Sequence, residues 1–380
     1  MIPRSAAPVG SAPALATVSS LPVGAARAPV DGPTAAAAAT IDHPSGFLAI
    51  APRNQRFTVD GVPGFVAYRR HGHHRICFGA AHAPAWCREN LLDAFLAASA
   101  ADGDRVTMVQ VRAADIDPLR RRGFRVNQFG SSYGLDLGRF TFAGTKRMKL
   151  RNRMKQASNA GVTVYEAGRD RPMTPELWNA LEAISAKWLR GKGNHELDFL
   201  IGELGGPNDP NRRFFVAEDA DHRPLGFITY VPVWGARPGW LHDLTRRLPK
   251  GPPGVMELIN ATAVGRFLDE RVPYLHFGLT PFIVDPEEPG GVNGSSTVAR
   301  LVRLIGRWGS FIYPARAQLQ YKHKWAPDVV DREFIAFQKV SFGALWALLN
   351  VTGSLPWGHQ KRVPALLPAA PPDNTPGGAA

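Results

Sequence analysis

Apolar residues between about residues 43 and 140 follow two alternating spacings. Short apolar runs predict strands at residues 65–68, 76–78, 106–111, 124–126 and 133–137. Helical spacing predicts helices at residues 86–100 and 114–122. The first two runs flank the polar stretch 71–74, which indicates a β-hairpin. This alternation predicts an α/β unit.

The chain from residue 141 to 352 continues the alternation. Its predicted helices lie at residues 145–160, 174–190, 253–270, 296–308 and 341–350. Its predicted strands lie at residues 162–165, 214–217, 225–231, 240–244, 274–277 and 334–337. Two helices, three successive strands, a helix and a strand are the order of an N-acetyltransferase-like (GNAT) fold. We therefore predict an α/β fold of tandem GNAT-like lobes with mixed central sheets, the first lobe over 43–140 and the second over 141–352.

Both ends of the chain depart from this pattern. Residues 1–42 are dominated by Ala and Pro and contain no aromatic residue, and residues 353–380 are rich in Pro. Such compositions cannot bury enough apolar surface to offset the entropy of ordering, so both ends are predicted to be disordered tails. The uncharged stretch 5–26 is interrupted by three prolines, so no integral membrane segment is predicted.

Composition narrows the function classes. The 380 residues include 2 cysteines, which excludes a disulfide scaffold and a multi-cysteine zinc module. Six His and Cys residues lie close in sequence, but their spacing matches no zinc template, and no metal site is predicted: His71, His73, His74, Cys77, His82 and Cys87. The 45 Lys and Arg residues exceed the 32 Asp and Glu residues, giving a formal charge of +13, so we expect an anionic partner.

The densest basic run lies on the predicted helix 145–160. Six positive charges occur within ten residues without an acid: Lys146, Arg147, Lys149, Arg151, Arg153 and Lys155. Such a helix suits phosphate contacts, and the alternative is a solvated helix face. We take Lys149, Arg151, Asn152, Arg153 and Lys155 as candidate substrate-binding residues.

Charged residues also close the predicted strand 240–244. In a regular strand, Asp243 and Arg247 would share one face and Arg246 would point to the other. A strand end can hold a carboxylate rigidly while a loop exposes it, so Asp243 could orient or deprotonate an acceptor. The alternative is a structural ion pair of Asp243 with Arg246 or Arg247.

A turn rich in Gly and Pro, residues 250–254, leads into the helix 253–270, with Glu257 one turn inside. A glycine-rich turn before a helix can bind a pyrophosphate through backbone N–H groups, but two prolines remove two of these donors. The turn therefore disfavours coenzyme A. The polar stretch 188–204, which includes Lys192 and Glu196, is either a binding loop or a plain surface loop.

Together these motifs resemble a known family. They are Lys149-Leu150-Arg151-Asn152 through Gly161, Ile184-Ser185 with Trp188-Leu189, Glu196, Phe199 and Gly202, Gly226-Phe227, Asp243-Leu244 with Arg246-Arg247, residues 254–258, and residues 277–281. In this order the chain from about 43 to 350 resembles the catalytic domain of bacterial phosphatidylglycerol lysyltransferases, the multiple peptide resistance factors. The resemblance implies tandem acetyltransferase-like lobes and the transfer of an aminoacyl group from a charged tRNA to a lipid hydroxyl.

The resemblance also implies site residues. The family's Asp-Leu-x-Arg motif falls on Asp243 and Arg246, and its preceding Lys and Glu fall on Lys192 and Glu196, so these four are the candidate catalytic residues. Arg247 and Glu257 join the basic helix as candidate substrate-binding residues, and Glu196 could read a cationic aminoacyl side chain. Full-length members carry a membrane flippase part ahead of this domain, where this sequence has the Ala/Pro tail, so we expect no lipid export.

The resemblance and the residues lead to three hypotheses. The first is an aminoacyltransferase that uses aminoacyl-tRNA as co-substrate, needs no cofactor, and modifies an anionic phospholipid or a small hydroxyl compound. The second is an acyl-coenzyme A-dependent N-acyltransferase, which the two prolines disfavour. The third is a non-catalytic RNA- or membrane-binding module. We expect the protein in the bacterial cytoplasm, either free or peripheral at the inner face of the membrane.

Overall fold

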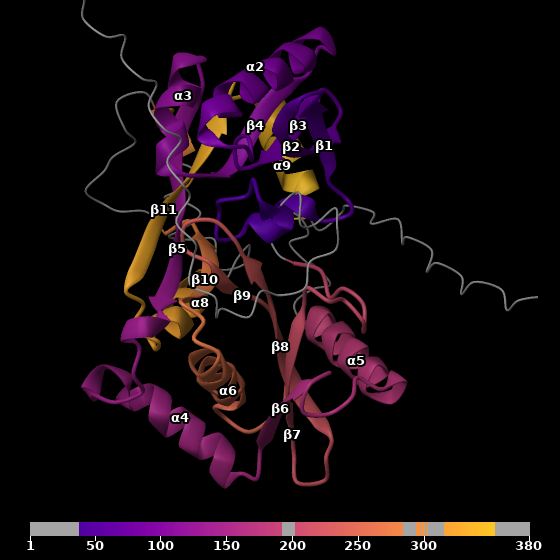
Figure 1. The fold of residues 1–380 in the computed structure, drawn as a ribbon, viewed down its shortest axis with the longest axis vertical. Helices are drawn as coiled ribbons and strands as arrows, with labels where there is room; N and C mark the ends of the chain where they lie inside the picture. Colours follow the sequence, from indigo (N-terminus) through magenta and orange to yellow (C-terminus); the bar gives the residue numbers. More distant parts are fainter. Residues whose placement is uncertain are drawn as a thin grey trace, which may run out of the picture.

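Within the residues that the structure describes, eleven strands form one mixed sheet (Figure 1). The computed structural model describes residues 38–191, 202–283, 294–296, 298–300, 302 and 315–353. The strands are β1 (Gln55–Val59), β2 (Val62–His71), β3 (His74–Phe78), β4 (Arg105–Val111), β5 (Arg125–Asp136), β6 (Thr163–Ala167), β7 (Arg213–Glu218), β8 (Pro224–Val233), β9 (Gly239–Arg247), β10 (Tyr274–Pro281) and β11 (Val329–Phe337). Their order in the sheet is β1-β2-β3-β4-β11-β5-β10-β9-β8-β7-β6.

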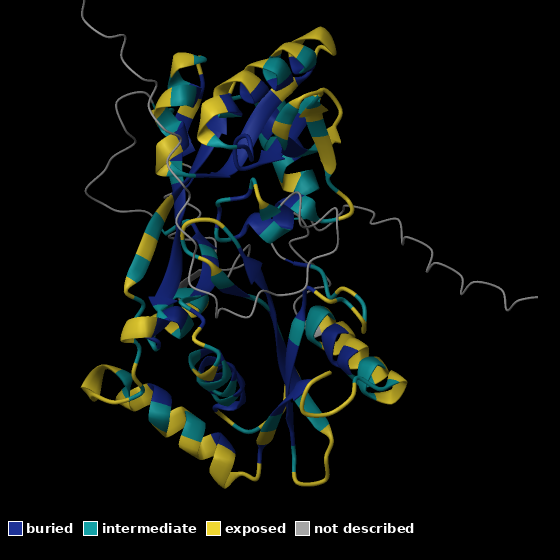
Figure 2. Ribbon diagram, viewed as in Figure 1, coloured by how far each residue is buried: buried dark blue, intermediate teal, exposed yellow. Residues whose placement is uncertain are grey.

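Seven α-helices lie against this sheet in the described residues. They are α2 (Ala85–Ala101), α3 (Ile116–Arg121), α4 (Met148–Asn159), α5 (Pro175–Gly191), α6 (Val255–Asp269), α8 (Ala315–His323) and α9 (Phe342–Val351). Short 3-10 turns occur at Gly46–Ile50, Ala113–Asp115, Leu137–Arg139 and Thr145–Arg147. The figures show helices on both sides of strands that are buried along most of their length (Figures 1 and 2).

Each half of the sheet has a hydrophobic core on both faces. In the half that contains β1 to β4, alternate strand residues face α2 on one side and α9 on the other. In the other half, Ile228 and Tyr230 pack with α6, whereas Phe227 packs with α5. Because neighbouring strand residues point to opposite faces, this alternation assigns each side chain of β8 and β9 to the α5 or the α6 face.

The C-terminal strand β11 lies between β4 and β5, far from its neighbours in sequence. It pairs antiparallel with both of them, with Val329 opposite Gly134 and Phe334 opposite Val111. Helix α9, which follows β11, packs against β2, β3 and β4. Segments from the predicted second lobe thus join strands of the predicted first lobe, and the division at residue 140 stays a prediction.

Most of the predicted elements are present with shifted ends, and the exceptions have physical reasons. The predicted strands 124–126 and 133–137 are one strand, β5, because small residues that break the apolar pattern are buried between two partners. At Gly130 a Cβ atom would lie 2.5 Å from the carbonyl oxygen of Thr280, so only glycine allows this approach. Strand β1 and helix α8 were not predicted, and most of the predicted helix 296–308 lies outside the described residues.

The predicted tails lie mostly outside the described residues. The described part of the first tail packs on the fold: the side chain of Ile41 is buried in the α9-side core. The carboxylate of Asp42 pairs with Arg112 at 2.8 Å. The folded part therefore includes residues 41 and 42, which the predicted boundary at 43 excluded.

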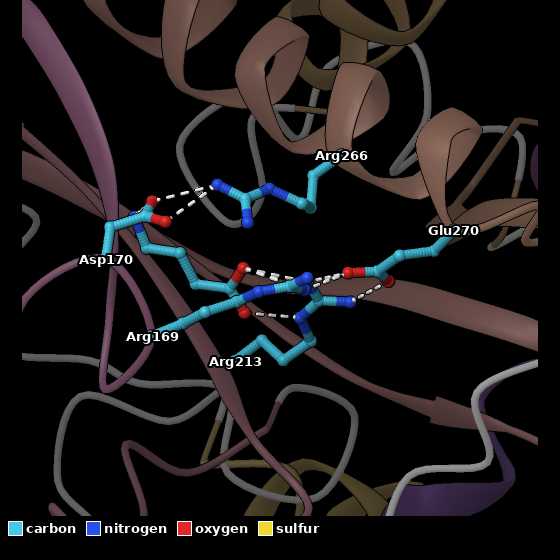
Figure 3. Close-up of polar contacts among 6 residues, drawn as sticks. Arg169, Asp170, Arg213, Arg266 and Glu270 are labelled. Atoms are coloured by element: carbon cyan, nitrogen blue, oxygen red, sulfur yellow. Dashed lines mark hydrogen bonds and ion pairs between the residues drawn. The ribbon is translucent and has the colours of Figure 1, made fainter.

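A network of ion pairs joins β6, the loop after β6, and β7 to the end of α6 (Figure 3). Arg213 donates to Glu166 through Nε at 2.6 Å and to Glu270 through Nη1 at 2.7 Å, and Arg266 donates to Asp170 at 2.8 Å. Burial by itself would raise the pKa of Glu270, but the hydrogen bonds and charge of Arg213 hold that pKa below its ordinary value. Each charge in this network has a partner, which indicates that the network holds these strands and α6 together and has a structural role.

Candidate active site

The parallel strands β9 and β10 pair over a short stretch and then part. Their pairing covers Tyr274 to His276 against Gly239 to Leu241. Beyond these pairs, β10 continues alongside β5 as far as Pro281, and β9 continues alongside β8 as far as Arg247. In open α/β sheets, ligands bind beyond the carboxyl ends of strands where neighbours diverge. The candidate residues of β9 lie in this diverging part.

A β-bulge at Asp243 and Leu244 sets the direction of these side chains. Ile228 of β8 lies opposite Thr245, and Tyr230 lies opposite His242, so β9 contains one residue more than β8 in this interval. As a result His242 and Thr245 share a face, and His242 Nε2 lies 2.6 Å from Thr245 Oγ1. The extra residue reverses the alternation on which the sequence prediction for Asp243 rested.

Asp243 is paired with Arg212, a residue that the sequence analysis did not single out. An Nη1 atom of Arg212 donates to Asp243 Oδ2, and the two side chains are 4% and 3% exposed. The same guanidinium donates to Thr229 Oγ1 at 3.3 Å, which places Arg212 and Asp243 on the α5 face. The backbone N–H of Gly202 donates to Asp243 Oδ1 at 3.1 Å. Asp243 does form an ion pair, but its partner is Arg212 and not Arg246 or Arg247, as the alternative predicted.

Glycine is required at position 202 by this contact. A Cβ atom there would lie 2.0 Å from Asp243 Oδ1, well inside van der Waals contact. Arg212 has Asp209 as a second acidic neighbour, with Nε 3.5 Å from Oδ2. The carboxylate of Asp243 is thus held in place by a cation and a backbone donor, and it keeps lone pairs for a further hydrogen bond.

Arg246 lies on the same face as Asp243, and Arg247 does not share it. The Nε of Arg246 donates to Ser185 Oγ of α5 at 3.2 Å, and its guanidinium lies 4.3 Å from the ring centroid of Trp188. Its side chain is buried, whereas Arg247 is exposed. A regular strand would have placed Asp243 on the face of Arg247, but β9 is not regular here, and the bulge places Asp243 on the face of Arg246 instead.

The other two candidate catalytic residues, Lys192 and Glu196, lie outside the described residues. The described residues on either side of them approach the same place, since Trp188 contacts Arg246 and Gly202 contacts Asp243. Their assignment as catalytic residues stays a prediction.

A buried lysine on α8 is a further candidate that sequence reasoning missed. Nζ of Lys322 donates to the carbonyl oxygens of Gly278 at 2.8 Å and Leu279 at 3.1 Å, in the part of β10 that has left β9. Burial lowers the pKa of Lys322 to about 7, against the opposing effect of Glu333. Such an amine can gain or lose a proton near neutral pH. The available signal was a lysine set among aromatic residues in the stretch 321–325.

Buried polar groups surround Lys322. Burial lowers the pKa of His242 to about 3, and the charge of Lys322 acts in the same direction, so this imidazole is neutral at pH 7. Glu333 is 2% exposed, accepts a hydrogen bond from Ser132 Oγ, and lies 3.2 Å from His43 Nε2. Buried ionisable groups cluster at functional sites more often than elsewhere, which supports this part of the sheet as the candidate site.

Glu257 and the basic helix lie on the α6 side. Glu257 accepts from Lys324 Nζ at 2.7 Å and is largely buried, so its charge already has a partner. Helix α4 packs along α6, away from α5 (Figure 1). Among the candidate substrate-binding residues of α4, Lys149, Asn152, Arg153 and Lys155 are exposed. Arg151 is half-buried and donates to the carbonyls of Phe142 and Gly144, both at 2.7 Å.

The structure thus brings together some of the predicted residues and separates others. Asp243 and Arg246 meet on the α5 face, whereas Glu257 and α4 lie on the α6 side. Across the described ranges, no three His, Cys, Asp or Glu side chains come together as a metal site. No helix within the described residues combines the length and the apolar character that crossing a bilayer requires.

Comparison with known proteins agrees with this architecture. The solved structure of L-PGS from Bacillus licheniformis is similar with a TM-score of 0.69 and 19% identity, covering 85% of this chain and 96% of that one. The C-terminal domain of a putative lysylphosphatidylglycerol synthetase from Agrobacterium fabrum is similar with a TM-score of 0.67 and 18% identity, covering 84% and 95%. These likenesses confirm the predicted GNAT-like α/β fold.

Curated relatives extend the likeness to sequence. The chain is 31% identical over 215 residues to the lysylphosphatidylglycerol biosynthesis bifunctional protein LysX of Nocardia farcinica, covering 55% of this chain and 18% of the relative. It is 27% identical over 266 residues to the LysX protein of Mycobacterium avium, covering 65% and 22%. The chain spans about a fifth of the length of these relatives. The family model described as phosphatidylglycerol lysyltransferase, C-terminal, matches residues 34–337, so the chain belongs to that family.

Proposed function

We propose that this chain transfers an aminoacyl group, lysyl or similar, from an aminoacyl-tRNA to a hydroxyl of an anionic phospholipid such as phosphatidylglycerol, at the inner face of the membrane. Membership of the family supports the class of reaction. The observation that carries the proposal is the buried pair of Asp243 and Arg212 beside Arg246, at the point where β9 leaves β10. A charged pair that is shielded from bulk water and keeps lone pairs for a further hydrogen bond suits the alignment of a polar substrate.

The chemistry needs few groups because an aminoacyl ester is already activated. The acceptor hydroxyl oxygen attacks the ester carbonyl carbon, and the bond between that carbon and the ribose oxygen breaks. The acceptor hydroxyl gives up one proton, and the departing ribose oxygen takes one up. The protein therefore has to align the two substrates, accept a proton, and stabilise negative charge as it develops.

Asp243 and Arg246 are suited to alignment and charge stabilisation. Both oxygens of Asp243 are held by Arg212 and Gly202, and the remaining lone pairs can accept from the ammonium group of the aminoacyl moiety. The buried guanidinium of Arg246 keeps a permanent positive charge that can stabilise an oxyanion or a phosphate.

Lys322 is suited to proton transfer. With a pKa of about 7, a large fraction of its amine is unprotonated at neutral pH and can accept the proton of the acceptor hydroxyl. The protonated amine can then return that proton to the ribose oxygen. Glu196 and the basic residues of α4 complete the proposal as contacts to the aminoacyl side chain and to the tRNA phosphates.

The test is to incubate the full chain with a mixture of charged tRNAs and phosphatidylglycerol vesicles, and to identify products by mass spectrometry. The expected product is phosphatidylglycerol that carries one amino acid, formed by the natural chain and strongly reduced in Asp243→Asn and Lys322→Met. Arg190→Gln, a change at an exposed residue near the end of α5, is the matched control. Acyl transfer from acetyl-coenzyme A to an amine, or binding of tRNA without any product, would overturn the proposal.

A further inference from the structure

Helix α9 is apolar on every side, yet only one of its faces is packed. Ala344 and Ala347 are buried against the sheet, and Leu348 and Val351 pack against the same core. Phe342, Trp346 and Leu349 point outward and are 81%, 47% and 36% exposed. A helix that is hydrophobic all round is normally covered on all sides. Here the outer face is open among the described residues.

The outer face is a fixed, continuous surface. Phe342, Trp346 and Leu349 follow the spacing i, i+4 and i+7, so they form one stripe along the helix. The rings of Phe342 and Trp346 stack with centroids 6.2 Å apart. Ser341 caps the helix by accepting from the backbone N–H of Ala344 at 3.1 Å. We call the side chains of Phe342, Trp346 and Leu349 the α9 stripe.

Positive charge surrounds the first turn of α9. Lys339 is exposed three residues before Phe342, and Arg125 lies opposite Phe337 on β5, on the same face as α9. His74 lies beside α9, since a Cβ atom added at Gly343 would come within 2.9 Å of its Nε2. Burial, and next the charge of Arg105, lower the pKa of His74, so this imidazole is neutral at pH 7 and the nearby cation is Arg105, which lies opposite His74 on β4. Asp104, the acid whose charge acts on His74, is already bound by Arg70 and Arg75. The helix itself carries no charged residue.

The size of the stripe argues against a second copy of the chain as its natural cover. A fully exposed aromatic side chain offers about 150–250 Å². The α9 stripe therefore offers on the order of 300 Å², against about 800 Å² per partner in a stable protein interface. An aromatic stripe with a basic rim is instead the pattern of helices that lie in the interface of an anionic bilayer.

We propose that the α9 stripe is the surface by which this protein docks on an anionic phospholipid bilayer. The choice of a bilayer rests in part on the proposed function, in which the acceptor is a membrane lipid. The core beneath α9 extends to Leu279 and Phe282 at the end of β10, and the carbonyl of Leu279 accepts from Lys322. Docking at α9 would therefore bring lipid to the lobe that holds this end of the candidate active site.

The first experiment measures flotation of the full chain with vesicles of phosphatidylglycerol and phosphatidylcholine. The double variant Phe342→Ala/Trp346→Ala should lower vesicle partitioning at least tenfold and leave the melting temperature unchanged. Trp86→Ala is the matched control, since Trp86 is 74% exposed and lies on α2, across the sheet from α9. Binding of the double variant equal to that of the natural chain would overturn the proposal.

A second measurement separates this proposal from the proposed function. With a short-chain, water-soluble phosphatidylglycerol, the double variant should keep its aminoacyl transfer rate, whereas its rate on vesicles should fall at least tenfold. If no chain transfers to any lipid, the proposed function fails while flotation still tests the docking surface. Two other results would overturn docking by showing another occupant of the stripe. One is that acrylamide quenches Trp346 only after residues 354–380 are removed. The other is that the natural chain is a dimer and the double variant is not.

Discussion

Replacing Asp243 with Asn tests whether its charge serves the reaction or only the fold. The change keeps the size of the side chain and leaves Arg212, which is 4% exposed, without its closest counter-charge. Breaking a buried pair by removing one partner costs about 3–5 kcal/mol. Arg212 retains Asp209 at 3.5 Å and Thr229 at 3.3 Å, so we expect the lower end, about 3 kcal/mol. With an unfolding entropy of about 2.1 cal/mol/K per residue over about 300 folded residues, that corresponds to a fall in Tm of about 5 °C.

The double variant Asp243→Asn/Arg212→Met separates the two roles. It removes both charges, and a buried pair replaced by neutral side chains of similar volume is often as stable as the original. We expect its Tm to recover most of the loss, while turnover per folded molecule stays about 10² below that of the natural chain, the scale of lost alignment. The assays are a thermal melt and the initial rate of aminoacyl transfer. Recovery of both Tm and turnover would refute a catalytic role for Asp243, and an unchanged Tm in the single variant would refute the stabilising role of the pair.

Three further predictions concern Gly254, helix α4 and Lys322. In Gly254→Ala the new Cβ atom would lie 1.9 Å from the Arg153 carbonyl oxygen at a φ of +89°. The free energy of unfolding measured by urea titration should therefore fall by at least the roughly 1–2 kcal/mol that a left-handed residue costs. Gly251→Ala, with open space around it, should not lower that free energy comparably. Changing Lys149, Arg151, Arg153 and Lys155 to Gln should weaken tRNA binding and flatten its salt dependence, and an unchanged slope would make α4 a solvated face. Because the pKa of Lys322 is about 7, transfer should accelerate as pH rises through 7, and Lys322→Arg should abolish that rise while Lys187→Arg keeps it.

The site residues that could be predicted from the sequence are those that lie close together in one segment of the chain. Asp243 and Arg246 stand out because charges follow directly on an apolar strand, and the family motif falls on them. Arg212 escaped notice because it comes from a polar turn 31 residues earlier and meets Asp243 only in the folded sheet. The bulge has no signature in the hydrophobic pattern, yet one extra residue reversed which arginine shares a face with Asp243.

The same distinction explains the elements. Helices with a clear apolar stripe, such as α4 with Leu150 and Ala157 buried, are where the pattern placed them. Strand β5 was divided in two because Gly130, Ser131 and Ser132 look like a turn, although two flanking strands bury them. Lys322 was missed because the pattern predicted no helix at 315–323, and the aromatic residues around it were the only local sign that this lysine is buried.

The position of β11 has a consequence for the order in which the protein can be made. Strands β4 and β5 are synthesised early, but the strand that joins them, with Val329 opposite Gly134, emerges about 200 residues later. Until then their facing edges lack a partner, and unpaired edges are the places where chains associate wrongly. The N-terminal half therefore cannot finish folding on the ribosome ahead of the rest. A nascent chain stalled before β11 should stay sensitive to protease throughout, and release of the complete chain should protect both halves in one step.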